Sequence, residues 1–122
     1  MIRLASKQAS ESKFSRARVG AVIAKGNRVL AVGHNRIGYS KHLRFRRFSE
    51  SIHAEQDAIL QLLKARRGDE LVGATIYVSR INNSEKPMLS RPCAMCNSLI
   101  QAVGIRQVVF TTNEGVAEYE CR

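Results

Sequence analysis

The sequence of 122 residues has no tryptophan, only two prolines and only three cysteines. Three cysteines are too few, and too odd in number, to form the disulfide framework of a small secreted domain. The apolar runs fall far short of the roughly 18 residues that a membrane span needs, and the N-terminus lacks an apolar signal-peptide core. We therefore expect a protein of the cytoplasm that neither spans a membrane nor is secreted.

Acidic residues are scarce as well. Ten Asp and Glu residues stand against 20 Lys and Arg residues, which leaves a formal net charge of +10. Such a charge on a short chain indicates an anionic partner, either a nucleotide phosphate or a nucleic acid, although solubility alone can also account for it. The hydrophobic content of 44% is ordinary for a globular protein, and the length fits one domain over residues 1–122.

The apolar pattern alternates between helical and extended segments. Helical spacing predicts three helices, at residues 1–14, 53–66 and 92–103. Short apolar runs predict four strands and a possible fifth, at residues 19–24, 29–32, 74–79, 105–111 and 116–119. The turn signal Lys25-Gly26-Asn27 joins the first two strands as a hairpin, and residues 36–52 and 81–91 are predicted to be polar loops. This order favours an α/β fold with three α-β-α layers, in which helices cover both faces of a central mixed sheet of four to five strands.

Two cysteines and one histidine stand at predicted helix starts. Cys93 and Cys96 are three residues apart, so one helical face presents both sulfurs to a single ion, and His53 begins another helix. A helix N-terminus lowers the pKa of a thiol, and two thiolates with one imidazole suit zinc. Three protein ligands leave a fourth position for water, as in catalytic zinc sites. A structural zinc would need a fourth protein ligand, for which the candidates are His34, His42 and Cys121.

Glu55 lies two residues after His53, where it can exchange protons with a metal-bound water. The motifs His53-Ala54-Glu55 and Pro92-Cys93-Ala94-Met95-Cys96 match the H-x-E and P-C-x-x-C signature of zinc deaminases. On these motifs the chain resembles the cytidine and deoxycytidylate deaminase superfamily, and small bacterial or phage deoxycytidylate deaminase-like proteins most closely. The resemblance extends to Val19-Gly20-Ala21-Val22-Ile23, Gly33-His34-Asn35 and the run from Pro92 to Ile105.

The resemblance implies a cytidine-deaminase-like fold and a role for each matching residue. The ligands of Zn²⁺ would be His53, Cys93 and Cys96. Glu55 would be the catalytic proton shuttle, the backbone N–H of Ala54 would meet the pyrimidine carbonyl, and Asn35 would bind the sugar or phosphate. The implied reaction is hydrolytic deamination of a cytosine nucleotide, dCMP giving dUMP and ammonia, by attack of zinc-bound hydroxide on C4. The resemblance also implies a homo-oligomer.

Residues 41–48 form the strongest basic cluster and directly precede His53. We predict that Arg44 and Arg46 of this cluster bind the substrate phosphate at the mouth of the site. The cluster would also suit the backbone of a single-stranded nucleic acid, and a solvated loop with its two aromatic side chains tucked inward is the alternative without a ligand. Deamination of a tRNA adenosine, of a cytosine in single-stranded DNA or of free cytidine therefore remains open, as does a non-enzymatic, zinc-stabilised nucleic-acid-binding domain.

One segment departs from the family pattern. Deoxycytidylate deaminases commonly place a short T-L-x-P-C segment between strand and helix, whereas here the eleven residues 81–91 separate Arg80 from Pro92. Arg80 precedes this segment and Arg91 ends it, and both could face a phosphate, although each is expected to be a surface residue. Thr111 is expected to be an ordinary strand-end residue.

Overall fold

The computed structural model describes residues 1–13, 17–37 and 51–121. The helices are α1 (Ile2–Ser10), α2 (Ala54–Lys64), the 3₁₀ helix η1 (Gly68–Leu71) and α3 (Ala94–Ala102). The strands are β1 (Arg18–Lys25), β2 (Arg28–His34), β3 (Arg36–Ile37), β4 (Ser51–Ile52), β5 (Thr75–Ile81), β6 (Pro87–Met88), β7 (Gln107–Thr112) and β8 (Gly115–Glu120). No helix in these ranges is long and apolar enough to cross a membrane.

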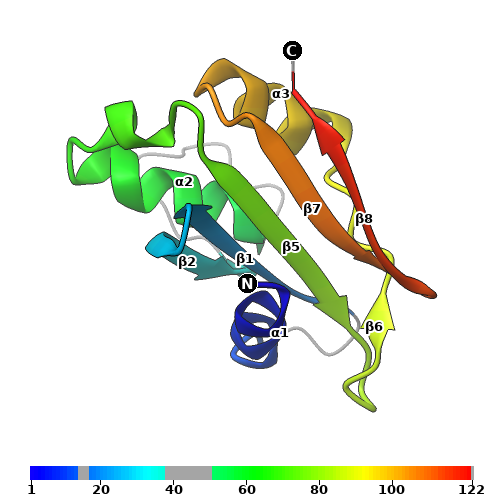
Figure 1. The fold of residues 1–122 in the computed structure, drawn as a ribbon. Helices are drawn as coiled ribbons and strands as arrows, with labels where there is room; N and C mark the ends of the chain where they lie inside the picture. The colour runs from blue at the N-terminus through cyan, green and yellow to red at the C-terminus, as the bar shows by residue number, and fades with distance from the viewer. Residues whose placement is uncertain (14–16, 38–50, 122) are drawn as a thin grey trace.

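A mixed sheet forms the centre of the molecule, with the strand order β2-β1-β5-β7-β8 (Figure 1). Strands β5 and β7 are parallel and are joined through α3, whereas the other neighbours in this order are antiparallel. The short strand β6 pairs with the end of β5. The predicted α-β-α arrangement is confirmed, and so is the antiparallel final strand, which pairs with β7 over its whole length.

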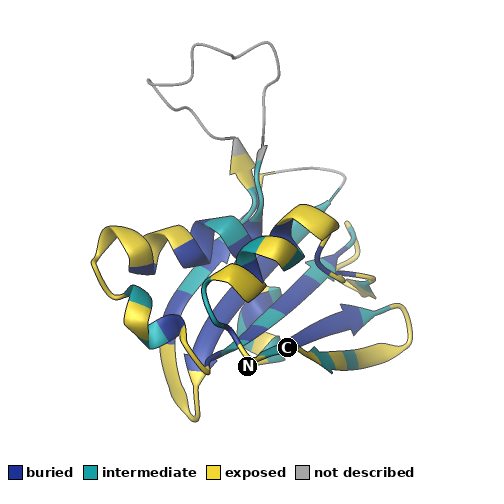
Figure 2. Cartoon of the chain, turned by 90° about the horizontal axis from the view of Figure 1, so that it is seen from above, coloured by how far each residue is buried: buried dark blue, intermediate teal, exposed yellow. Residues whose placement is uncertain are grey.

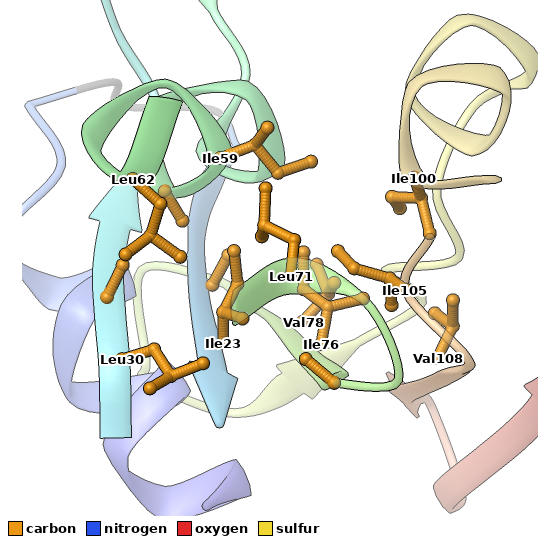
Figure 3. Packing of buried hydrophobic residues seen from close by; sticks show 14 of the residues in the cluster. Ile23, Leu30, Ile59, Leu62, Leu71, Ile76, Val78, Ile100, Ile105 and Val108 are labelled. Carbon is orange, nitrogen blue, oxygen red and sulfur yellow. The ribbon is translucent and has the colours of Figure 1, made fainter. Parts of the chain in front are cut away.

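Helices cover both faces of the sheet. Helix α1 packs on β1 and β5, and α2 packs on the opposite face against β2 and β1. Strand β1 is buried along most of its length, as its unbroken apolar run predicts. Figure 2 shows the buried parts of the sheet under helices whose outer faces are exposed. Figure 3 shows the core between the sheet and the α2/α3 layer. Its largest side chains come from both helices and four strands, and include Ile23, Leu30, Ile59, Leu62, Ile76, Ile100 and Val108.

Two glycines let these helices approach the strands closely. A Cβ added to Gly20 of β1 would lie 2.1 Å from the carbonyl oxygen of Ala5 in α1. A Cβ added to Gly33 of β2 would lie 2.8 Å from the carbonyl oxygen of Ala54 in α2. Both distances are shorter than any normal contact, so only glycine permits this seating. The position of Gly33 therefore sets how close the N-terminus of α2 lies to the sheet.

The two predicted loops contain more regular structure than the sequence suggests. The loop prediction for residues 36–52 is wrong at both ends, because Arg36–Ile37 and Ser51–Ile52 pair as the antiparallel strands β3 and β4. In the second loop, Arg80 pairs with Met88 and Ile81 with Pro87. Pairs this short have no apolar period that a sequence pattern could reveal. The β5/β6 pair folds the segment before α3 back onto the end of β5.

Candidate metal centre and active site

The three predicted zinc ligands meet at one point between two helix N-termini. The ligand atoms of His53, Cys93 and Cys96 all lie within 4.8 Å of one another. The Nδ1 atom of His53 is 3.2 Å from the Sγ atom of Cys96 and 3.8 Å from the Sγ atom of Cys93. Residues 40 positions apart in the chain are thus brought within reach of a single ion.

Local backbone structure explains this placement. His53 is the N-cap of α2, and its backbone N–H donates to the side-chain oxygen of Gln56 at 2.9 Å. Cys93 is the N-cap of α3, where its sulfur accepts from the backbone N–H of Cys96. An N-cap residue has an extended backbone, so its side chain turns toward the free N–H groups of the first helical turn. The sequence analysis missed the role of Gln56, although an N-cap followed three residues later by Gln is the capping-box pattern.

The donor set fits zinc. Zn–N bonds of about 2.0 Å and Zn–S bonds of about 2.3 Å at tetrahedral angles place the donors about 3.6 Å from one another. The two observed N···S distances, 3.2 and 3.8 Å, lie on either side of this value. Among the described residues, neither His34 nor Cys121 belongs to the cluster. The third candidate for a fourth ligand, His42, lies outside the described residues.

Glu55 lies beside the metal donors and is almost fully buried. Burial of its side chain raises the pKa of Glu55. A backbone hydrogen bond, the charge of His53 and a hydrogen bond from the Cys96 thiol lower that pKa in part. A carboxylate in this setting takes up a proton more readily than an exposed one does. The prediction that Glu55 sits next to the metal therefore agrees with the geometry, and its catalytic role stays a prediction.

The expected effect of the helix N-terminus on thiol acidity is wrong for Cys96. Burial raises the pKa of the Cys96 thiol, and the charge of Glu55 and the contact with Cys93 raise it further. They act against the helix dipole, which favours the thiolate at the same end of α3. The buried thiol therefore needs a nearby cation to ionise, and a bound divalent metal ion provides one.

A cavity of about 290 Å³ opens over this cluster. It is lined by residues from the start of β1, the ends of β2 and β5, the N-termini of α2 and α3, and the segment before α3. These residues are Ala17, Val19, Asn35, His53, Ala54, Glu55, Arg80, Leu89, Ser90, Arg91 and Cys93. The volume is at the lower end of the range for small-molecule sites, so a ligand of nucleotide size would largely fill it.

The structure places two of the four predicted substrate residues at the cavity wall. Ala54 is the first residue of α2, so its backbone N–H has no partner within the helix. The side chain of Asn35 donates to the carbonyl oxygen of Ala17 at 2.6 Å and accepts from the backbone N–H of Val19 at 3.0 Å. Asn35 thus ties the end of β2 to the start of β1. The other two, Arg44 and Arg46, lie outside the described residues with the rest of the 41–48 cluster.

A buried polar network that the sequence analysis missed holds the segment before α3. The hydroxyl of Ser90 donates to the carbonyl oxygen of Val78 at 2.8 Å and accepts from the backbone N–H of Thr111 at 2.9 Å. The hydroxyl of Thr111 donates to the carbonyl oxygen of Met88 at 2.7 Å and accepts from the backbone N–H of Arg80 at 3.1 Å. Thr111 is therefore a buried connector, and the expectation that it is an ordinary strand-end residue is wrong.

Comparison with known proteins places the chain among the deaminases. The family model for the cytidine and deoxycytidylate deaminase zinc-binding region matches residues 1–112. The deoxycytidylate deaminase of Mycobacterium phage D29 is 29% identical over 126 residues, which cover 88% of this chain and 88% of that protein.

Two solved structures share the fold. The dCMP deaminase from the cyanophage S-TIM5, in complex with dCMP and dUMP, has a TM-score of 0.68 at 22% identity and covers 89% of this chain and 76% of its own. The cytidine deaminase from Burkholderia pseudomallei has a TM-score of 0.70 at 21% identity and covers 98% of this chain and 89% of its own. These two similarities confirm the predicted fold class.

Proposed function

Because the chain belongs to the cytidine and deoxycytidylate deaminase family, we propose that this zinc-dependent deaminase converts dCMP to dUMP and ammonia by hydrolysis. The observation that carries the proposal is the cluster of three metal donors with a buried carboxylate at the base of a nucleotide-sized cavity. The relative from phage D29 is named a deoxycytidylate deaminase, and the cyanophage structure contains dCMP and dUMP, which together favour dCMP over other cytosine compounds.

The metal ligands would be His53, Cys93 and Cys96. A zinc ion held there would act as a Lewis acid and lower the pKa of the attacking water. Glu55 accepts the proton of the attacking water and delivers it to ring nitrogen N3 as the oxygen adds to C4. The carboxylate then takes the proton of the new C4 hydroxyl group and passes it to the exocyclic nitrogen, so that the C4 carbonyl forms as the C4–N bond breaks and ammonia leaves. Burial raises the pKa of Glu55 above its ordinary value, which favours proton uptake by this carboxyl.

The backbone orients the base for this reaction. The N–H of Ala54 at the start of α2 donates to the carbonyl group of the pyrimidine ring. The small, fully buried side chain of Ala54 lets the ring approach the helix end closely. Glu55 is the next residue on the same helical turn, so one rigid element carries the carbonyl donor and the proton carrier. This arrangement positions C4 without a mobile side chain.

The test is a screen for ammonia release in which zinc is quantified in the same protein sample. The substrates are dCMP, deoxycytidine, dCTP and a cytosine-containing single-stranded oligonucleotide, and a Glu55→Gln variant is the blank. We expect dCMP to be the best substrate, the activity to disappear on chelation, and added zinc to restore it. Preferred turnover of the oligonucleotide, or activity that survives complete removal of metal, would contradict the proposal. The homo-oligomer and the cytoplasmic location stay predictions.

A further inference from the structure

We infer that Arg80 and Arg91 form an anion site in the catalytic cavity and make the enzyme selective for a nucleoside 5′-monophosphate over the nucleoside. The inference rests on the proposed function and assigns the phosphate to these two side chains. Both arginines line the cavity that also contains Glu55 and His53. Arg80 precedes the segment 81–91 and Arg91 is its last residue. Because this segment departs from the family pattern, these contacts depend on how this chain builds it.

The strand geometry directs Arg80 toward the site. The hydroxyl of Ser79, one residue earlier in β5, lies 2.7 Å from the hydroxyl of Ser6 in α1, so Ser79 faces the α1 layer. Side chains alternate along a strand, and Arg80 therefore faces the opposite layer, with α2 and α3. Val19 is its partner across the sheet, and both residues line the cavity. The backbone N–H of Arg80 is held by Thr111, so the strand end is fixed there.

Aromatic rings hold Arg91. Its guanidinium carbon lies 4.5 Å from the ring centre of Tyr119 and 5.5 Å from that of Phe110. The hydroxyl of Tyr119 in turn donates to the side-chain oxygen of Asn97 in α3 at 2.7 Å. Stacking uses the flat face of a guanidinium and leaves the N–H groups at its edge free to bind a phosphate oxygen. Tyr119 is therefore a positioning residue that orients Arg91.

The charge balance of the cavity favours an anion. Glu55 is the sole carboxylate among the described residues that line it, and it is buried beside the metal donors. In the described part of the chain, neither Arg80 nor Arg91 takes part in an ion pair. Two cavity-lining arginines without carboxylate partners in the described part of the chain offer N–H donors to a phosphate, which can accept from several N–H groups at once.

The test compares the wild type with Arg80→Gln, Arg91→Gln and a matched control, Arg106→Gln. Arg106 is exposed and lies outside the cavity, so its loss changes the net charge by the same amount. The measured quantity is the ratio of kcat/KM for dCMP to kcat/KM for deoxycytidine. We expect this ratio to fall about 10- to 100-fold in each cavity variant and to stay at the wild-type value in the control. Inorganic phosphate should compete with dCMP in the wild type and more weakly in both cavity variants.

Variants of Tyr119 test the positioning role separately. Tyr119→Leu removes the ring under Arg91 and should lower the same ratio, whereas Tyr119→Phe keeps the ring and should restore it toward the wild-type value. A change caused only by general destabilisation would lower kcat/KM for both substrates and leave the ratio constant. An unchanged kcat/KM ratio in Tyr119→Leu would show that Tyr119 does not position Arg91 for the phosphate.

Binding of the product separates this inference from the proposed reaction. Calorimetry with dUMP and deoxyuridine measures the anion site without turnover. If no cytosine compound is deaminated but dUMP binds more weakly to both cavity variants, the anion site stands and the proposed reaction fails. If the wild type processes deoxycytidine as well as dCMP, or if the cavity variants keep the wild-type ratio, the anion site is overturned. The anion site is also overturned if the wild type does not bind dUMP but the two cavity variants bind an oligonucleotide more weakly than the wild type does.

Discussion

The metal side and the arginine side of the cavity are built in different ways. The metal side takes His53 and Glu55 from the start of α2, and Cys93 and Cys96 from the start of α3. Within each helix start, the spacing along the chain sets the geometry. The arginine side depends on the pairing of β5 with β6, on the hydroxyl of Thr111 and on the ring of Tyr119. The chemistry therefore resides in compact motifs, whereas substrate selection is distributed over the sheet.

The largest effect is expected on the metal side, from Glu55→Gln. Loss of a positioned general acid–base group lowers kcat by about 10²- to 10⁴-fold. The variant should bind zinc as the wild type does, since Glu55 is not one of the three donors. Steady-state kinetics and metal analysis of the same sample check both statements. Glu114→Gln, which removes an exposed carboxylate, is the control and should keep full activity. Normal turnover by Glu55→Gln would refute the assigned role.

A pair of glycine variants tests how far the metal side depends on the sheet. Gly33→Ala and Gly20→Ala each force a Cβ into the backbone of a packed helix, and overpacking of this kind costs about 1–3 kcal/mol of folding free energy. Only Gly33 lies against α2, which carries His53 and Glu55. We expect both variants to unfold at lower denaturant concentration, and only Gly33→Ala to lose activity in conditions where it stays folded.

The two variants control for each other, because each replaces a buried glycine and the two glycines lie in neighbouring strands, β1 and β2. Equal losses of activity would show that the effect is general destabilisation and that the seating of α2 is not critical for the site. Wild-type activity in Gly33→Ala would show that α2 moves as a unit without disturbing its N-terminus.

The polar network under the arginine side should contribute to stability. Ser90→Ala and Thr111→Val each leave buried backbone groups without a partner, which costs about 1–3 kcal/mol per variant. Because the two hydroxyls lie 2.8 Å apart in one network, the double variant should lose less than the sum of the two single losses. Denaturant unfolding measures this coupling, with Ser98→Ala on the exposed side of α3 as the control. Strictly additive losses would contradict a shared network.

A smaller effect concerns the metal-free protein and its pH dependence. Burial raises the pKa of Glu55 in the folded state, so the folded protein holds this proton more tightly than the unfolded chain does. The stability that Glu55 contributes is therefore present below its ordinary pKa of 4.5 and is lost as the pH rises through the raised pKa. Metal-free Glu55→Gln should melt at a higher temperature than the metal-free wild type at pH 7, and this advantage should shrink toward pH 4.5. An advantage that is constant with pH would contradict the burial argument.

The alternating order of elements predicted the layers and both helix starts because buried strands and amphipathic helices have distinct apolar periods. The zinc ligands were predictable because residue type and spacing both constrain metal binding, and the structure brings His53, Cys93 and Cys96 together as expected. The pairs β3/β4 and β5/β6 were not predictable, since two-residue strands are too short to show a period. The raised pKa of Cys96 also could not be predicted, because it depends on burial and on Glu55 rather than on the helix end alone.

By itself, the sequence determined the three metal donors, the adjacent carboxylate and the α/β class, because each depends on residues within one helical turn or on the period of one segment. Only the tertiary structure decided that Arg80 and Arg91 share the cavity with Glu55, and that Thr111 and Tyr119 hold them there. These contacts join β5, β7, β8 and the segment before α3, which lie far apart in the chain. No local pattern encodes them, since they arise from strand pairing and from the packing of one layer on the next.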